Sequence, residues 1–67
     1  AGFADLILIA DNSVLFVEVK TEKGRQSERQ KDFQKRVNLL GFEYIIVRSL
    51  NDFISSTEKW LKSRLYC

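Results

Sequence analysis

Two apolar runs separated by a two-residue turn constrain the fold of this chain more than any other feature. The runs are ADLILIA, residues 4–10, and SVLFVEVK, residues 13–20, and both have the branched and aromatic composition of strands. Asp11 and Asn12 lie between them, and asparagine tolerates the positive φ of a tight hairpin turn. Such a turn sets residue 10 opposite residue 13, so the register of the whole hairpin is predicted.

This register places charge on an otherwise apolar pair of strands. Asp5 falls directly across from Glu18, and Lys20 lies on the same face because strand side chains alternate. Two opposed carboxylates repel each other, and burial strengthens the repulsion. We therefore expect a positive charge between them, supplied by Lys20 or by a divalent cation. The chain has no histidine, and oxygen ligands suit Mg²⁺ or Mn²⁺ rather than zinc.

A helix is predicted after the hairpin and a polar loop. Ser27 is a suitable N-cap for the segment 27–40, and Gly41 follows as a C-terminal stop. The apolar stripe of this helix is expected at Phe33, Val37 and Leu40.

A third strand is predicted over residues 43–49 and a second helix over residues 50–65, capped by Ser49 or Asn51. The expected order is β-β-α-β-α, with the third strand parallel to the second. The chain is thus predicted to be one α/β domain, residues 1–67, with a mixed sheet flanked by helices. The expected apolar face of the second helix comprises Ile54, Leu61 and Leu65, flanked by Phe53 and Trp60.

The composition excludes several kinds of chemistry. Without histidine there is no Ser-His-Asp or Cys-His nucleophile, and the single cysteine, Cys67, excludes a disulfide framework. No apolar run is long enough to span a membrane and no secretory signal is present, so an intracellular location is expected, in a bacterium, a phage-infected host or a nucleus. The net charge of +2 is compatible with a polyanionic partner without requiring one.

With these residues in place, the chain resembles the PD-(D/E)XK nuclease superfamily and, within it, the VRR-NUC branch. The resemblance implies a minimal restriction-endonuclease-like core that hydrolyses DNA phosphodiester bonds. It also implies a homodimer selective for branched or junction DNA, such as a Holliday junction in DNA repair. The matching pieces, in family order, are GFADLIL (2–8), FVEVK (16–20), GRQSERQKDF (24–33) and LLGFEYIIVRSLNDF (39–53).

The resemblance also assigns roles to single residues. Asp5, Glu18 and the backbone carbonyl of Val19 would hold Mg²⁺ or Mn²⁺. Lys20 would orient or activate the attacking water and stabilise charge on the phosphate. Gln30 matches a helix glutamine that the family places beside this site.

The chain departs from the family pattern in two places. Ala4 stands where the signature has proline, a position that gives shape rather than a ligand. The family core also begins with a helix and a strand before the aspartate, and we expect both to be missing from residues 1–67 or to come from a partner chain.

Simpler interpretations exist for the same residues. Glu18 and Lys20 also fit an ordinary ion pair, and Ser27 with Gln30 fits a capping box. The expected nucleic-acid-binding cations alternate with acidic residues, as on a solvated helix face. Besides the nuclease, we therefore retain a non-catalytic nucleic-acid-binding or dimerisation fragment and a purely structural domain. The cations in question are Lys23, Arg25, Arg29 and Lys31; Arg48, also expected to bind nucleic acid, follows the third strand and fits a simple surface arginine equally well.

Overall fold

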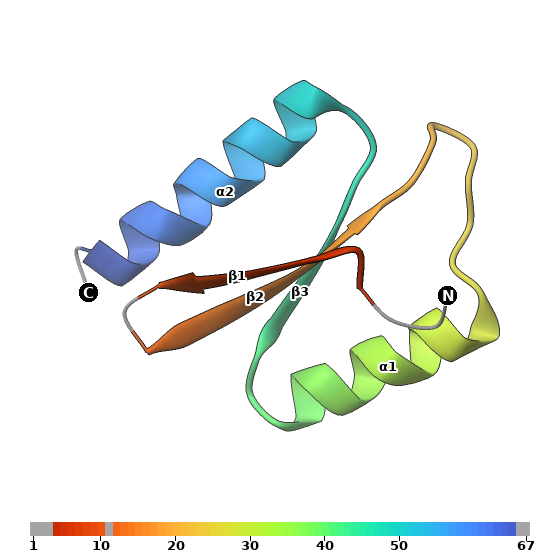
Figure 1. The fold of residues 1–67 in the computed structure, drawn as a ribbon, viewed down its shortest axis with the longest axis horizontal. Coiled ribbons are helices and arrows are strands. Elements are labelled where there is room, and N and C mark those ends of the chain that lie inside the picture. The colour runs from red at the N-terminus through yellow and green to blue at the C-terminus, as the bar shows by residue number, and fades with distance from the viewer. Residues whose placement is uncertain (1–3, 11, 66–67) are drawn as a thin grey trace.

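The computed structural model describes residues 4–10 and 12–65 and confirms a small α/β domain. Three strands form a mixed sheet in the order β1-β2-β3, and the two helices lie on either side of it (Figure 1). None of the helices in these residues is long and apolar enough to cross a membrane. The elements in chain order are β1 (Leu6–Ala10), β2 (Ser13–Val19), α1 (Glu28–Leu39), β3 (Glu43–Val47) and α2 (Leu50–Leu65).

The hairpin has the predicted register over the length of β1. The antiparallel pairs run from Leu6 opposite Val17 to Ala10 opposite Ser13, and Asn12 has the expected positive φ of 66°. Asp11, the other predicted turn residue, lies outside the described residues. β2 pairs with β3 in parallel, which is also as predicted. All three strands are shorter than expected, and the largest difference for the site is that β1 starts at residue 6 rather than 4.

The apolar core lies between the sheet and α2. Leu15 and Val17 of β2 are fully buried there, and Val47 of β3 and Trp60 of α2 are almost fully buried. Burying an apolar side chain of this size stabilises the fold by about 1.5–3 kcal/mol. The partly buried residues packed around this centre are Leu8, Ala10, Ile45 and Phe53.

The predicted apolar face of α2 is wrong. Ile54 is 44% exposed and Leu61 is 38% exposed, whereas Trp60 is only 5% exposed. Phe53 and Trp60 are seven residues apart and therefore lie on one face of the helix, and burying two aromatic rings removes more surface from water than burying isoleucine and leucine. The side chain of Leu65 lies outside the described set.

The N-terminus of α2 decides between its two predicted caps. The hydroxyl of Ser49 accepts a hydrogen bond from the backbone N–H of Asp52 at 3.0 Å, so Ser49 is the cap and Asn51 is not. The Asp52 carboxylate in turn accepts from the N–H of Arg48. This reciprocal arrangement fixes the chain direction where β3 passes into α2.

Helix α1 begins and ends as the sequence indicates. Ser27 and Gln30 form a complete capping box, and Gly41, with φ of 90°, follows the C-cap Leu40. The N–H groups of Gly41 and Phe42 donate to carbonyls of the last turn, which is the Schellman arrangement. Leu40 is 74% exposed, so its predicted place in the apolar stripe is wrong.

Helix α1 packs through its middle. Phe33 places its ring edge-on to Phe16 of β2 and Tyr44 of β3, and Val37 is buried beside them. Because β-strand side chains alternate, these residues lie on the sheet face opposite the α2 core. Glu18, two residues after Phe16, is on this same face.

The observed orientation of α2 predicts unequal effects of two neighbouring substitutions. Trp60→Ala should lower the free energy of unfolding by about 3–5 kcal/mol because it removes a buried aromatic ring, which is enough to unfold much of so small a domain. Leu61→Ala should lower it by less than about 1 kcal/mol, since that side chain keeps much of its contact with water. Urea unfolding followed by circular dichroism measures both. Equal losses would contradict this orientation.

Candidate active site

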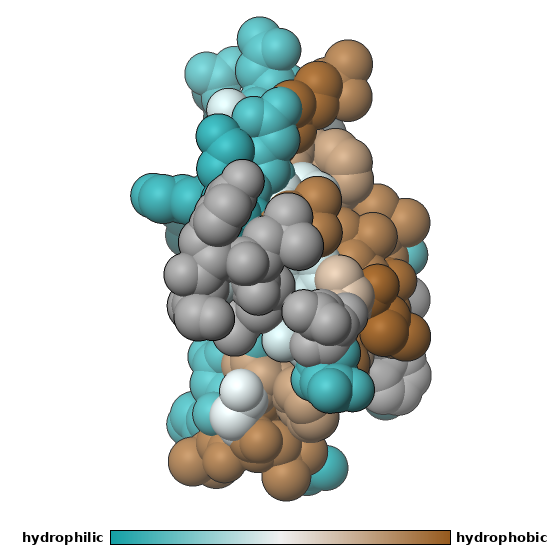
Figure 2. All heavy atoms as spheres, turned by 90° about the vertical axis from the view of Figure 1, so that its left-hand side faces the viewer, coloured by the Kyte–Doolittle hydropathy of each residue, from teal (hydrophilic) through white to brown (hydrophobic). Residues whose placement is uncertain are grey.

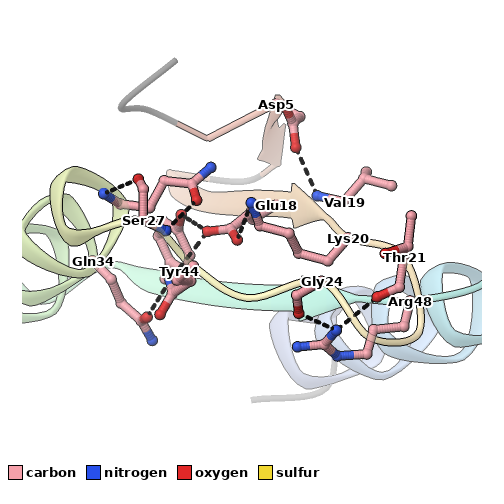
Figure 3. Close-up of polar contacts among 12 residues, drawn as sticks. Asp5, Glu18, Val19, Lys20, Thr21, Gly24, Ser27, Gln34, Tyr44 and Arg48 are labelled. Carbon is pink, nitrogen blue, oxygen red and sulfur yellow. Dashed lines mark hydrogen bonds and ion pairs between the residues drawn. The ribbon is translucent and has the colours of Figure 1, made fainter.

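Glu18 is a fully buried carboxylate at the centre of a polar cluster between the sheet and α1. Its Oε1 accepts a hydrogen bond from the Tyr44 hydroxyl at 2.5 Å and another from the Gln26 amide at 3.1 Å. The Lys20 ammonium lies 3.5 Å from Oε2 (Figure 3). Strand β2, strand β3 and the loop before α1 therefore all contribute side chains to one buried charge.

The two oxygens of Glu18 are in unlike surroundings. Oε1 has two hydrogen-bond donors, whereas Oε2 is buried and has no hydrogen-bond partner in the part of the chain that the structure describes. Lys20 faces Oε2 at ion-pair distance, with its own side chain 20% exposed. A buried charged oxygen without a hydrogen bond is costly, so this atom is the feature of the site that most needs a partner.

Asp5 does not take the position that the extended register predicts. The ladder ends at the pair Leu6 and Val17, and the N–H of Asp5 donates to the Val17 carbonyl at 3.0 Å. The Asp5 carboxylate accepts from the backbone N–H of Val19 at 2.7 Å. The predicted direct pairing of Asp5 with Glu18 is therefore wrong. The physical reason is that the short aspartate side chain competes with the strand for the next backbone donor.

Asp5 nevertheless contacts the backbone next to Glu18 across the hairpin. The N–H that it accepts belongs to the peptide bond that joins Glu18 to Val19, and its side chain is solvent-exposed at the start of β1 (Figure 3). Its negative charge also contributes to raising the pKa of Tyr44. One carboxylate is thus exposed and one is buried at the same end of the hairpin.

No three histidine, cysteine, aspartate or glutamate side chains are grouped to hold a metal ion within residues 4–10 and 12–65. The predicted ligand set is smaller than that, with two carboxylates and the Val19 carbonyl. The role of that carbonyl stays a prediction.

Tyr44 was not among the residues singled out from the sequence. It is buried on β3, opposite Phe16, and reaches Glu18 across the parallel strand pair. Burial raises its pKa above the usual value, and the hydrogen bond to Glu18 with the nearby negative charge raises it further. The hydroxyl is therefore held in its protonated form as a donor. A tyrosine in an apolar strand gives no sequence signal of this role.

The amide beside Glu18 comes from Gln26 rather than from Gln30. The Gln30 side-chain carbonyl accepts from the N–H of Ser27 at 3.0 Å, so the capping interpretation of Gln30 is confirmed. Gln26 donates both to Glu18 and to the Gln34 side-chain carbonyl on α1, at 3.1 and 2.9 Å. The sequence does contain two glutamines around the cap, but only the fold decides which one reaches the strand.

Arg48 anchors the loop that carries Gln26. Its Nη1 donates to the carbonyls of Thr21 and Gly24 at 2.7 Å each, and to that of Glu22 at 3.3 Å (Figure 3). A Cβ at Gly24 would lie 2.9 Å from the Thr21 hydroxyl oxygen, so a larger residue there would have to displace the Thr21 side chain. The nucleic-acid contact expected of Arg48 stays a prediction, and the contacts observed are structural.

The other predicted nucleic-acid-binding cations are solvent-exposed around this loop and the first turns of α1. Lys31 also lies 3.7 Å from the Glu28 carboxylate, one turn away. Such an exposed pair contributes at most about 0.5 kcal/mol to the helix. The exposure of these four cations is compatible both with a solvated helix face and with a surface that binds phosphate groups.

Comparisons with family models, curated proteins and solved structures give no match to this chain.

The Arg48 contacts predict a local change without global unfolding. Arg48→Gln should raise the hydrogen-exchange rate of the Gly24 amide by about tenfold, because the loop loses its bonds to one guanidinium. Overall stability should fall by about 1 kcal/mol. Lys62→Gln on α2, which removes the same charge from an exposed position, is the control. Unchanged exchange at Gly24 in Arg48→Gln would contradict this anchoring role.

Proposed function

We propose that this domain is a metal-dependent nuclease that hydrolyses phosphodiester bonds of DNA, of the PD-(D/E)XK type that its sequence resembles. The observation that carries the proposal is the buried Glu18 carboxylate, whose Oε2 faces the Lys20 ammonium and accepts no hydrogen bond within residues 4–10 and 12–65. A carboxylate and a lysine two residues apart at a strand end are the residues that the resemblance assigns to chemistry.

The donor set fits a hard divalent cation. Oε2 of Glu18 is paired with an ammonium and accepts no hydrogen bond among the described residues, and the exposed Asp5 carboxylate binds the N–H of the next residue, Val19. Mg²⁺ and Mn²⁺ accept such oxygen ligands together with water and phosphate oxygens. When bound, the ion would lower the pKa of water and neutralise charge on the phosphate.

The protein groups would act on the phosphate directly. The Lys20 ammonium, partly exposed beside Glu18, donates hydrogen bonds to the attacking water and to a phosphate oxygen. The water oxygen adds to phosphorus and releases one proton to solvent, the bond to the leaving sugar oxygen breaks, and that oxygen takes up one proton from solvent. The products are one phosphate monoester and one hydroxyl end.

The exposed cations Lys23, Arg25, Arg29 and Lys31 would hold the DNA backbone beside this site. Contacts of this kind give affinity that is independent of sequence and decreases with salt. A preference for branched or junction DNA and a role in DNA repair follow from the resemblance.

A second function is favoured by the position of Asp5. Its carboxylate binds the Val19 N–H instead of facing Glu18, as expected for a fragment that keeps the fold and binds nucleic acid without cutting it. A purely structural ion pair between Lys20 and Glu18 is the third reading, and it predicts no effect of metal on stability.

A cleavage assay separates these functions. The domain should nick a synthetic four-way junction with Mg²⁺ or Mn²⁺ and not with EDTA. Asp5→Ala and Lys20→Ala should each reduce the rate by at least about 100-fold, because each removes a charge that acts on the reacting groups. Asp32→Ala and Lys62→Ala are charge-matched controls at exposed positions that should cut normally. Salt-sensitive DNA binding with no cleavage would instead establish the binding fragment.

We also propose that two copies of the domain associate through β1. Among the described residues β1 is an edge strand, and its sequence, LILIA, contains no charge or proline to prevent pairing. Ile7 and Ile9 are 56% and 77% exposed on one face, and apolar side chains gather along one flank of the molecule (Figure 2). An antiparallel pair of β1 strands would be self-complementary about a two-fold axis.

Sedimentation tests this association. The domain should sediment as a dimer at micromolar concentration, and Ile9→Lys should convert it to a folded monomer because the lysine places charge in the strand pair. Ile54→Lys, at an exposed apolar position on α2, is the matched control and should remain dimeric. A wild-type domain that is monomeric under these conditions would contradict the proposal.

A further inference from the structure

The two carboxylate oxygens of Glu18 have different partners in the polar cluster around this residue. Oε1 receives the Tyr44 hydroxyl at 2.5 Å and the Gln26 amide at 3.1 Å. An ionised carboxylate oxygen has about two lone-pair positions for donors. Oε1 is therefore filled by the protein, whereas Oε2 is buried and, among the described residues, has the Lys20 ammonium at 3.5 Å and no hydrogen-bond donor.

Both donors to Oε1 are held in place by other contacts. The Tyr44 side chain is buried on β3, and the Phe33 ring lies edge-on to its own ring with centroids 6.2 Å apart. The Gln26 amide also donates to the Gln34 side-chain carbonyl at 2.9 Å, which ties it to α1. Neither donor can leave Oε1 without breaking a second contact or opening the packing between the sheet and α1.

A purely structural role predicts a different arrangement. If the cluster served only to neutralise a buried carboxylate, its donors would be expected to satisfy both oxygens, because an orphaned charged oxygen costs stability. Here two neutral donors share one oxygen, and the other is left to positive charge. This division is useful when one oxygen must stay available to a cation.

We propose that Tyr44 and Gln26 are positioning residues that bind Oε1 of Glu18 and thereby reserve Oε2 for a divalent cation. This inference rests on the proposed function and adds two residues that act on the metal ligand rather than on the substrate. They fix the rotation of the carboxylate, as hydrogen-bond partners of metal ligands commonly do. Neither residue contacts the reacting phosphate in this proposal.

The experiment measures Mn²⁺ affinity directly, so it does not depend on cleavage. Free Mn²⁺ is titrated by electron paramagnetic resonance against the whole domain and its variants, without DNA and at one pH. Tyr44→Phe removes only the hydroxyl that reaches Oε1, and Gln26→Ala removes only the amide. Each should weaken Mn²⁺ binding about 10–100-fold, the usual effect of losing a partner of a metal ligand.

Two reference variants make the outcomes separable. Glu18→Gln removes the proposed ligand and should abolish binding, and Asn38→Ala removes an exposed amide from α1 and should bind as the wild type does. Circular dichroism of each metal-free variant shows whether it folds, and Gln26→Ala provides the test where Tyr44→Phe does not fold.

Two results would overturn the inference in distinguishable ways. If the wild type and Glu18→Gln both fail to bind Mn²⁺, the proposed function fails and the inference falls with it. If Glu18→Gln abolishes binding while folded Tyr44→Phe and Gln26→Ala bind Mn²⁺ as the wild type does, the metal site stands and the positioning role is wrong. Weaker binding by the two variants at unchanged fold supports the inference.

Discussion

The buried charge of Glu18 is the constraint around which this side of the domain is built. A carboxylate without solvent contact must be compensated by donors and a cation, or it would destabilise the fold by several kcal/mol. Its partners are Lys20 just after β2, Tyr44 on β3 and Gln26 in the loop before α1, so they meet only when the parallel strand pair and α1 are in place. The charge therefore makes the arrangement of this layer specific, and it does so at the expense of stability.

The two faces of the sheet differ in what they bury. Leu15, Val17, Val47 and Trp60 form an apolar centre under α2, where burial alone is favourable. The α1 face has its polar groups enclosed instead, and the connecting loop is fixed at both ends. Arg48 holds its start through backbone carbonyls, and the capping box of Ser27 holds its end. Gln26 lies one residue before that cap, which explains how a loop residue reaches a buried strand.

Local features of the fold could be predicted from the sequence, and features that depend on packing could not. The hairpin register follows from a two-residue turn, and the α1 caps follow from Ser27, Gln30 and Gly41, because each depends on neighbours in the chain. The face of α2 depends on which side chains fill the space above the sheet, so the spacing of Ile54 and Leu61 was misleading. The spacing of apolar residues in α2 is compatible with more than one buried face. The volume of the side chains that fill the space above the sheet determines which face is buried.

The candidate site also contains residues that the sequence predicts and residues that only the packing brings together. Glu18 and Lys20 were found because they interrupt an apolar strand, a conflict that the sequence displays. Tyr44 is an ordinary strand residue and Gln26 an ordinary loop residue, so neither stands out in the sequence. Their contacts with Glu18 arise only from tertiary structure. Asp5 lies between these cases, since the register predicts its neighbourhood but its side-chain bond to the Val19 N–H ends the ladder before the predicted pair of Asp5 and Glu18.

The unequal surroundings of the two Glu18 oxygens are the observation on which the proposed metal site rests. Replacing a buried pair by apolar residues is often neutral or stabilising, so stability alone gives little reason to retain one. An arrangement that saturates Oε1 and leaves Oε2 to a lysine 3.5 Å away retains the desolvation cost without the full compensation. Such local costs are characteristic of residues kept for function. A cation at Oε2 would remove this cost, and this is the physical basis of the metal-dependent reaction that we propose.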